Sequence, residues 1–386
     1  MTSNNYRFLN GGRLIHIRDA VIGDILVSES QQAILDDPAM QRLRQIKQLG
    51  FAYLVYPGAN HTRFEHSLGA MSITREILQN ALNERIEELE CAALLHDIGH
   101  AAYSHISDAL LRRYLHTTHE KLGLKKIANG TVRDKIKDSG LSYSKVVSYM
   151  KGKGKGEIIT GSLGADRFDY LARDAHYTGV GYGIVDYGHM RNKITISNNR
   201  PAIYDSAVSN AEYMLIARYL MFSSIYHHHT ILIAQGMYEK AVDFAVESGK
   251  MLPEDLETLN DWQMLSSLYS TKESQRLVKR LSERTLFKRA FFDKIGKNVD
   301  ENEVRAAIEK EGFGSDEYIC NIHQYKGHND DAVVVFKDGS REVKLTELSP
   351  IVGALVKMIK ESRRLLVACD QGKVPKMKKI VERFVR

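Results

Sequence analysis

Four polar side chains that lie far apart in the chain have the types that bind a divalent metal ion. His96 and Asp97 are adjacent and follow the apolar run of residues 91–95, where more Leu or Ala would be expected. Burying an imidazole and a carboxylate without partners is costly, so we expect this pair to have a partner. Neutral imidazole and carboxylate together suit a divalent ion. His66 upstream and Asp166 downstream would supply two further ligands.

The motifs around these ligands follow one another in a specific order. Arg-x-x-His at residues 63–66 precedes His-Asp at 96–97 and Asp-x-x-Asp-Tyr at 166–170. Taken singly, each ligand also fits a plainer role, as a core histidine or a helix cap. Together they neutralise a divalent ion and, in a six-coordinate site, leave room for water and substrate. His96 and His100 also have the spacing of a zinc-protease helix, but Asp replaces Glu and no third protease ligand is evident, so we rank that site lower.

Composition bounds the class of protein. The 386 residues are 43% hydrophobic and 26% charged, which is ordinary for a globular chain of one large or two smaller domains. The net charge of +6 is mild and scattered, so nucleic-acid binding is compatible with it but not indicated. The three cysteines are too widely spaced for a zinc ribbon. A polar amino terminus and no long apolar stretch predict a cytoplasmic protein without membrane contact.

Most of the elements that must position these ligands are predicted to be helices. The expected helices are residues 38–49, 65–82, 84–96, 104–115, 118–128, 164–176, 206–248, 254–268, 272–283 and 350–366. Short hairpins are expected at 13–27 and at 183–205, where Asn198-Asn199 lies near the turn, and a strand–turn–strand at 332–345. The basic loop at 151–156 lacks a P-loop ending and is interpreted as a linker. The predicted class is mostly α, with a helical domain at 1–260 and a smaller α+β region at 261–386.

The chain resembles the HD-domain phosphohydrolases, and within them the dNTP triphosphohydrolases related to the SAM-and-HD-domain enzyme of animal cells. The resemblance runs from about Asp19 to the helix around His228, and no SAM domain is expected. The segments that carry it are QRLRQIKQLG at 41–50, YPGA at 56–59, HDIGH at 96–100 and DYLARD at 169–174. It implies a helical HD core in which His66, His96, Asp97 and Asp166 hold the metal.

The resemblance also implies a reaction. Water on one divalent ion per subunit (Mn, Fe, Mg, Co, Ni or Zn) would attack the α-phosphorus of a dNTP and release a deoxynucleoside and triphosphate. His119 falls at the family's general-acid position and Asp108 at that of its orienting carboxylate. His100 and His105 would contact the phosphates. Each of these histidines also fits an ordinary position on a helix surface.

Further matched positions would bind nucleotides. Arginine gives phosphate directional hydrogen bonds, and a leucine would crowd a 2′-hydroxyl, although both also occur as surface ion pairs and core residues. The substrate positions are Arg63 and Arg167 for phosphate, Gln48, Tyr170 and Asp174 for the sugar, Leu49 for the 2′ position, and Tyr226 and His228 on a closing helix. The positions that match an activating guanine-nucleotide site are Asp36, Gln41 and Arg44.

Three functions follow from these observations. The leading one is a metal-dependent dNTP triphosphohydrolase, because the ordered ligands and the sugar-pocket positions occur together. The second is another HD-type phosphohydrolase, either a nucleotidase or a phosphodiesterase or nuclease, because a fold alone does not fix a substrate. The third is a nucleotide- or nucleic-acid-binding regulator with a vestigial site, which the presence of all four ligands argues against. The resemblance further implies a homo-oligomer, either a dimer or a tetramer.

Overall fold

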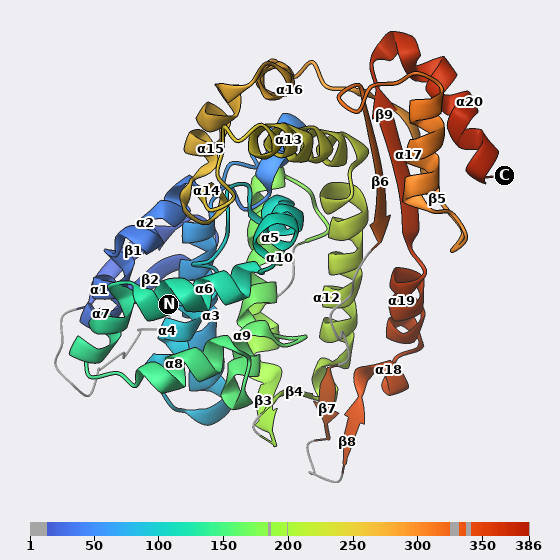
Figure 1. Cartoon of the computed structure of the whole chain (residues 1–386). Coiled ribbons are helices and arrows are strands. Elements are labelled where there is room, and N and C mark those ends of the chain that lie inside the picture. The colour runs from blue at the N-terminus through green and yellow to red at the C-terminus, as the bar shows by residue number, and fades with distance from the viewer. Residues whose placement is uncertain (1–13, 184–186, 199, 325–331, 337–340, 386) are drawn as a thin grey trace.

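Helices build most of the protein, and three small sheets lie at its edges (Figure 1). The structure is a computed structural model that describes residues 14–183, 187–198, 200–324, 332–336 and 341–385. A mostly α fold with short hairpins and a C-terminal α+β region, as predicted, is confirmed. Among these residues, none of the helices is both long enough and apolar enough to cross a bilayer.

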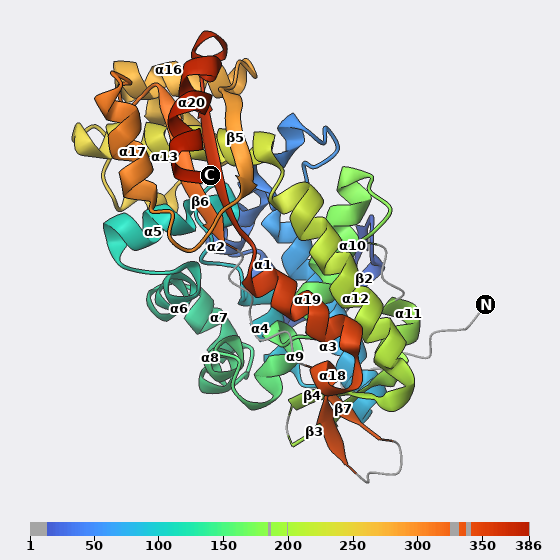
Figure 2. The ribbon, with the colours of Figure 1, turned by 90° about the vertical axis from the view of Figure 1, so that its right-hand side faces the viewer.

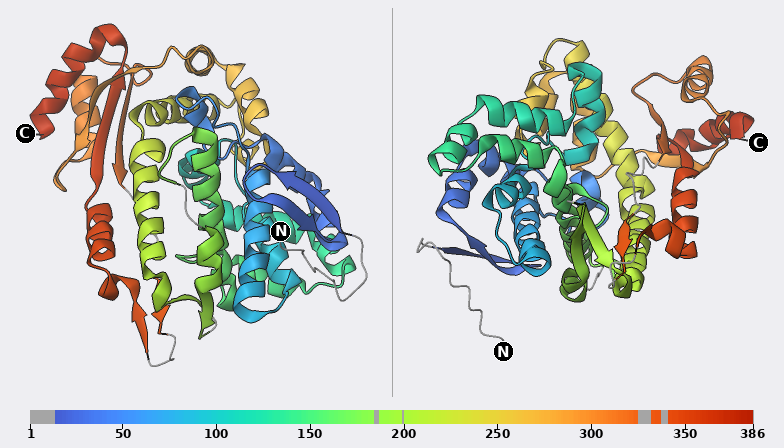
Figure 3. Two further views of the ribbon diagram at one scale, coloured as in Figure 1. Left: turned by 180° about the vertical axis from the view of Figure 1, so that it is seen from behind. Right: turned by 90° about the horizontal axis from the view of Figure 1, so that it is seen from below.

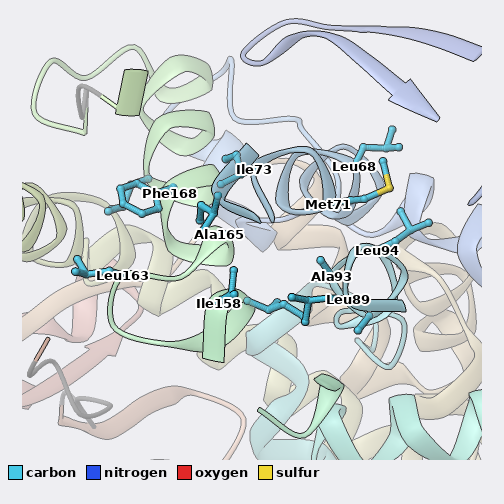
Figure 4. Packing of buried hydrophobic residues seen from close by; sticks show 14 of the residues in the cluster. Leu68, Met71, Ile73, Leu89, Ala93, Leu94, Ile158, Leu163, Ala165 and Phe168 are labelled. Carbon is cyan, nitrogen blue, oxygen red and sulfur yellow. The ribbon is translucent and has the colours of Figure 1, made fainter. Parts of the chain in front are cut away.

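Three helices form the centre of the first half. They are α3 (Arg63–Leu82), α4 (Glu87–Leu95) and α10 (Ala165–Thr178), and α3 packs against both of the others. A capping box between Thr62 and Glu65 begins α3, and left-handed Asn83 ends it. Figure 4 shows the apolar side chains of these helices meeting in one core. The core fixes the ends of α3, α4 and α10, which are the parts that carry the predicted ligands.

Shorter elements surround this centre. A hairpin of β1 (Ile15–Asp19) and β2 (Gly23–Val27) lies at one edge, as predicted. Gly23, in the left-handed region, begins β2. The surrounding helices are α1 (Glu29–Leu35), α2 (Pro38–Gln41), α5 (Asp108–Leu115), α6 (His119–Asn129), α7 (Val132–Asp138), α8 (Tyr143–Met150) and α9 (Glu157–Thr160).

The second half continues the helical layer. Figure 3 shows α12 (Val208–Met221) beside α10, and α13 (His229–Glu247) then contacts the C-terminal sheet. The other helices of this half are α11 (Tyr187–Met190), α14 (Asp255–Thr258), α15 (Asp261–Ser267), α16 (Lys272–Ser282), α17 (Glu301–Lys310), α18 (Leu345–Leu348), α19 (Pro350–Lys360) and α20 (Val374–Val385).

Two further sheets belong to this half. One has the order β5 (Lys288–Lys294), β9 (Arg363–Cys369), β6 (Tyr318–Gln324), and its strands are antiparallel. The other has the order β3 (Ile194–Ser197), β4 (Arg200–Tyr204), β7 (Val333–Val335), β8 (Glu342–Lys344). The predicted pairings β3–β4 and β7–β8 are present, whereas Asn199 and residues 337–340 lie outside the described residues.

The pairing of β4 with β7 joins the two predicted domains. These strands run parallel, with Ala202 opposite Val333, and Figure 2 shows β7 next to the β3–β4 hairpin. Val334 and Val352 are buried in the same core as the first half of the chain. One sheet thus contains strands from both sides of the predicted domain boundary at residue 260. That boundary stays a prediction.

Several predicted helices differ from the structure, among them that over 254–268, which is α14 and α15 with Leu259 and Asn260 between them. Residues 38–49 form only α2 and a 3-10 turn, because the next segment turns aside and Lys47 pairs with Thr62. The helix predicted over 206–248 is interrupted by a π-helical turn, Phe222–Tyr226. The one predicted over 350–366 ends at Lys360, and Arg363–Cys369 is the central strand β9. A short apolar run has no periodicity that separates a strand from a buried helix.

Gly99 allows α6 to approach the end of α4, so Gly99→Ala is expected to destabilise the protein. A Cβ at this position would overlap the carbonyl oxygen of His119 and the backbone nitrogen of Gly123, which are backbone atoms that no rotamer change can move away. Overpacking of this kind costs about 1–3 kcal/mol. Denaturant unfolding measures the loss, and Gly181→Ala is the control because a Cβ there meets nothing within 4 Å. Equal stability of the two variants would contradict the close approach.

Candidate metal centre

The structure brings the four predicted metal ligands together. His66 lies on α3, His96 and Asp97 directly follow the last residue of α4, and Asp166 lies in the first turn of α10. Nε2 of His66 is 3.0 Å from Oδ1 of Asp166 and 3.5 Å from Oδ2 of Asp97. Nε2 of His96 is 3.3 Å from Oδ1 of Asp97 and 3.7 Å from Oδ1 of Asp166. Two imidazoles and two carboxylates thus face one another, and their role as metal ligands stays a prediction.

The unpartnered atoms of these side chains fit a divalent cation. Nε2 of His66 and Nε2 of His96 are buried and make no hydrogen bond, although carboxylate oxygens lie close to both. Each Nδ1 is already used: that of His66 by Asp169 at 2.7 Å, and that of His96 by the carbonyl of Ala93 at 2.7 Å. Such second hydrogen bonds orient the rings of metal-binding histidines. The free Nε2 atoms and neighbouring carboxylates therefore form a donor set for a metal ion.

The electrostatics of the site also favour a bound cation. Burial lowers the pKa of His66, but the close carboxylate of Asp166 and the hydrogen bond to Asp169 together outweigh burial and raise that pKa to about 10. Burial raises the pKa of Asp97, but the charge of Arg63 and the interactions with His96 and His100 together outweigh burial, so the net shift is downward. The carboxylates are thus ionised and need positive charge, which a proton on His66 or a metal ion can supply.

A chain of ion pairs behind His66 was missed by the sequence analysis. Asp169, which orients His66, accepts from both Nε and Nη2 of Arg173 at 2.8 Å. Arg173 is fully buried and also donates to Asp19 at the end of β1, at 2.8 Å from Nη1. Gly69 permits this arrangement, because a Cβ there would overlap the Asp169 carboxylate. The available signal was the Asp-x-x-Asp spacing, which places Asp169 one turn after Asp166.

Four further predicted residues form a second polar group beside the first. His100 begins it, with Nε2 only 3.2 Å from Oδ1 of Asp97. Oδ1 and Oδ2 of Asp108 accept from Nδ1 of His119 at 2.9 Å and Nδ1 of His105 at 3.0 Å. The rings of His100 and His119 stack, with centroids 4.0 Å apart. The predicted His119–Asp108 pair is thus present as a hydrogen bond.

The pKa values of the buried His100 and the half-buried His119 shift in opposite directions. Burial lowers the pKa of His119, but its hydrogen bond to Asp108 and that carboxylate's charge outweigh burial, so the net shift is upward. Burial and the charge of Arg63 lower the pKa of His100 well below its ordinary value. Near neutral pH, His119 is therefore the better proton donor, while His100 is neutral.

The predicted sugar-binding residues lie around Asp174. Oδ1 of Asp174 is 2.7 Å from Nε2 of His61, and its Oδ2 accepts from the hydroxyl of Tyr226 at 2.6 Å. The ring of Tyr170 meets that of Tyr226 edge to face. The backbone N–H of Gln48 donates to the carbonyl of His61, and Oε1 of Gln48 is buried without a partner. An unpaired buried amide oxygen is available to a ligand hydroxyl. His61 was not predicted.

Family comparison agrees with this arrangement. The HD domain family matches residues 63–174, and the HD associated region family matches residues 185–386. The chain belongs to the HD-domain family. An uncharacterized protein of Methanocaldococcus jannaschii is 34% identical over 358 residues, which cover 88% of this chain and 75% of that protein. The predicted family is therefore confirmed.

One enzyme and one solved structure extend the comparison. The deoxynucleoside triphosphate triphosphohydrolase of Homo sapiens is 28% identical over 339 residues, which cover 70% of this chain and 54% of that enzyme. This HD-domain chain therefore matches about half the length of the human enzyme. A crystal structure of a hypothetical protein from Aquifex aeolicus is 28% identical, with a TM-score of 0.80 over 96% of this chain and 100% of that one.

The remaining predicted residues lie around the HD site with other partners. Arg63 is buried and donates to Asp97 at 2.7 Å, so its guanidinium supports a predicted metal ligand. Arg167 is buried and donates to the carbonyl of Ser162 at 3.3 Å. Leu49 packs against the cluster of Ala52, Ala59 and Ile231. The ring of His228 accepts a hydrogen bond from the backbone N–H of Thr230 and so caps the start of α13. The same ring packs edge to face against Tyr56 rather than against the predicted metal ligands or the second polar group.

The three residues predicted to bind a regulatory nucleotide lie together at a different place. Asp36, Gln41 and Arg44 line a cavity of about 200 Å³ next to the β1–β2 hairpin. Arg44 stacks on the ring of Phe64 at 3.6 Å, and Gln41 donates to the carbonyl of Leu35. The cavity and the HD site thus share helix α3, on which Phe64 is two residues before His66.

Asp97→Asn is expected to reduce metal affinity at least about tenfold, because the amide cannot neutralise the ion as a carboxylate does. Asn keeps the size of Asp, so Arg63 retains an oxygen partner. Elemental analysis after dialysis against defined metal concentrations measures the loss. Asp134→Asn, an exposed position on α7, is the matched control. Full metal occupancy in the Asp97 variant would contradict the ligand assignment.

Proposed function

We propose that this HD-domain phosphohydrolase is a metal-dependent deoxynucleoside triphosphate triphosphohydrolase, which converts a dNTP to a deoxynucleoside and triphosphate. The observation that carries the proposal is the contact between the two polar groups, where Asp97 lies 3.2 Å from His100. Because His100 also stacks on His119, a candidate metal site and a candidate proton donor lie next to each other. Hydrolysis of a phosphate ester needs both, since charge develops at phosphorus and the leaving oxygen must be protonated.

The side chains have distinct roles in this proposal. A divalent ion held by the four ligands would act as a Lewis acid toward phosphate and lower the pKa of a water. His119 holds the proton for the leaving 5′-oxygen on Nε2, because Asp108 occupies Nδ1. His100 and His105 contact phosphate oxygens from the same side. Arg63 keeps Asp97 ionised and oriented.

Substrate selection rests on the residues around Asp174. The carboxylate of Asp174 and the unpaired amide oxygen of Gln48 are hydrogen-bond acceptors, and either suits the single proton of a 3′-hydroxyl. Tyr170 and Tyr226 supply an aromatic wall. Leu49 offers an apolar surface that leaves a 2′-hydroxyl without a partner, which disfavours ribonucleotides. Similarity to the human dNTP triphosphohydrolase over 70% of this chain supports the same assignment.

Analysis of the products tests the proposal directly. The protein is loaded in turn with Mn, Fe, Mg, Co, Ni and Zn and incubated with each dNTP, with and without a guanine nucleotide. We expect deoxynucleoside and intact triphosphate, and slower turnover of the matching ribonucleotides. Ion-exchange chromatography separates the phosphate products by chain length. Release of monophosphate or pyrophosphate would assign another HD-type phosphohydrolase, and absence of turnover with every metal would oppose the proposal.

His119→Asn is expected to lower kcat by about 10²- to 10⁴-fold, the range typical of general acids. Because the pKa of His119 is raised, its acid form persists above the ordinary histidine range. Wild-type kcat should therefore fall on the alkaline side, as pH rises through this raised pKa, and the variant should lack that limb. His116→Asn is the control, since His116 is exposed and its left-handed backbone suits Asn. An unchanged alkaline limb in the His119 variant would remove this assignment.

Regulation and assembly belong to the same proposal. The cavity of Asp36, Gln41 and Arg44 combines an arginine, an amide and a carboxylate, groups that can recognise a guanine nucleotide. We propose that such a nucleotide activates the enzyme, and that the protein acts as a homo-oligomer in the cytoplasm.

A further inference from the structure

The loop between His100 and His105 has a strained backbone. Tyr103 and Ser104 are consecutive residues with φ of 59° and 60°, a region that non-glycine residues rarely adopt. Each such residue costs roughly 1 kcal/mol or more and persists only where neighbouring contacts enforce it. The strain lies between two histidines of the proposed phosphate site, so the contacts that enforce it also position these histidines.

A carboxylate from a distant part of the chain holds this loop. Oδ1 of Asp261 accepts from the backbone N–H of Tyr103 at 2.7 Å, and its Oδ2 accepts from the N–H of Lys47 at 2.9 Å. Asp261 is the first residue of α15, is only 3% exposed and lies in the HD associated region. The ring of Tyr103 is also fixed, because it stacks on Phe51 with centroids 4.3 Å apart. One side chain thus joins the strained loop to the segment before Gln48.

The hydrogen bonds of Asp261 to Tyr103 and Lys47, which we call the clamp, are connected to the predicted metal ligands by further hydrogen bonds. The hydroxyl of Ser104 donates to the carbonyl of Lys47 at 2.6 Å and accepts from Nε of Arg63 at 2.9 Å. The Nη1 of Arg63 in turn donates to Asp97. Nearby, Arg42 donates to the carbonyl of His100 at 2.8 Å and to that of Leu259 at 2.6 Å. The segment before α15 is therefore connected by hydrogen bonds to both polar groups of the site.

Because Asp261 is buried, its ionised form lowers the free energy of unfolding. Burial raises its pKa, the two backbone hydrogen bonds and the charges of Lys47 and Arg42 oppose the rise, and the result is about 6. The other titratable groups that face it are the hydroxyls of Tyr53, Tyr103 and Tyr238. Because the folded pKa lies above the unfolded value of 3.8, ionisation of Asp261 lowers stability as pH rises through this interval. A residue selected for stability alone would be neutral here.

We propose that Asp261 is a positioning residue of the HD site, whose carboxylate holds the strained 100–105 loop and the Lys47–Gln48 backbone in the geometry that turnover requires. The part of this inference that concerns turnover rests on the proposed function. The clamp itself is independent of the substrate. An amide cannot replace the carboxylate, because its NH₂ group would face one of the two backbone N–H donors.

The variant Asp261→Asn distinguishes an effect on the position of the catalytic groups from an effect on the stability of the fold. At pH 7 we expect kcat to fall roughly 10- to 100-fold with little change in KM, as small misplacements of catalytic groups do. Hydrogen exchange of peptides spanning 42–49 and 100–107 should be faster in this variant. Its unfolding temperature, relative to the wild type, should increase as pH is raised from about 4 to about 7, because the costly ionisation has been removed. Asp261→Glu should recover part of the kcat, and Glu254→Gln, exposed in the same segment, should match the wild type.

The outcomes distinguish this inference from the proposed function. If the wild type hydrolyses dNTPs and Asp261→Asn keeps full kcat and full exchange protection, the clamp is wrong and the function stands. If the wild type has no dNTP activity, the exchange and pH measurements still decide on the clamp. If Asp261→Asn does not fold, Asp261→Glu is measured instead: exchange of 100–107 should be faster than in the wild type, because the longer side chain cannot hold both backbone N–H groups in the same geometry. Unchanged protection of 100–107 in that variant would overturn the proposal.

Discussion

The hydrogen bond from His66 to Asp169 is the contact on which the rest of the site depends. It occupies Nδ1 of the imidazole and leaves Nε2 directed at Asp97 and Asp166. Asp169 can be buried as a carboxylate only because Arg173 pairs with it, and Arg173 can be buried only because its guanidinium also donates to Asp19. A row of alternating charges thus runs from the β1–β2 hairpin to the candidate metal ligands. The fold positions this row by packing α10 against α3 at Gly69.

A close approach of two helices at a glycine also links the metal ligands to the candidate proton donor. Gly99 lets α6 approach the end of α4, and this approach places His119 against His100. Asp108 then ties His119 and His105 together from α5. The result is a continuous polar interior within an otherwise apolar helical core. Such an interior is unfavourable for stability unless its groups are paired, which explains why nearly every carboxylate here has a basic or amide partner.

Strain and buried charge are concentrated at the same place. Two consecutive residues in left-handed conformation, the buried Asp261 and the unpaired amide oxygen of Gln48 all border the loops that carry the predicted substrate residues. Each feature lowers the free energy of unfolding. Their coincidence is what is expected where a protein maintains a geometry for binding or catalysis at the expense of stability.

Much of the HD site was predictable because its motifs are local. The helices that carry His66, His96 and Asp166 follow the apolar periodicity around them, and the types and order of the ligands indicate a metal. The prediction of a helix over 38–49 is wrong because residues 46–48 form hydrogen bonds with residues 61–63. No local sequence pattern indicates these hydrogen bonds. Residues 363–366, the first part of β9, are predicted as the end of a helix because a short segment with buried apolar residues has no periodicity that separates a strand from a helix.

The sequence by itself determined the chemical types at the site, the helical class and the family, since these depend on residue identity and on periodicities of a few residues. Only the tertiary structure decided which atoms meet. It placed Asp261 against Tyr103, turned Arg63 toward Asp97, and left Nε2 of His66 and His96 without hydrogen bonds. It also set the pKa values, because burial and neighbouring charge come from elements far away in the chain. Such contacts result from packing of the whole fold, and packing is not encoded within any one segment.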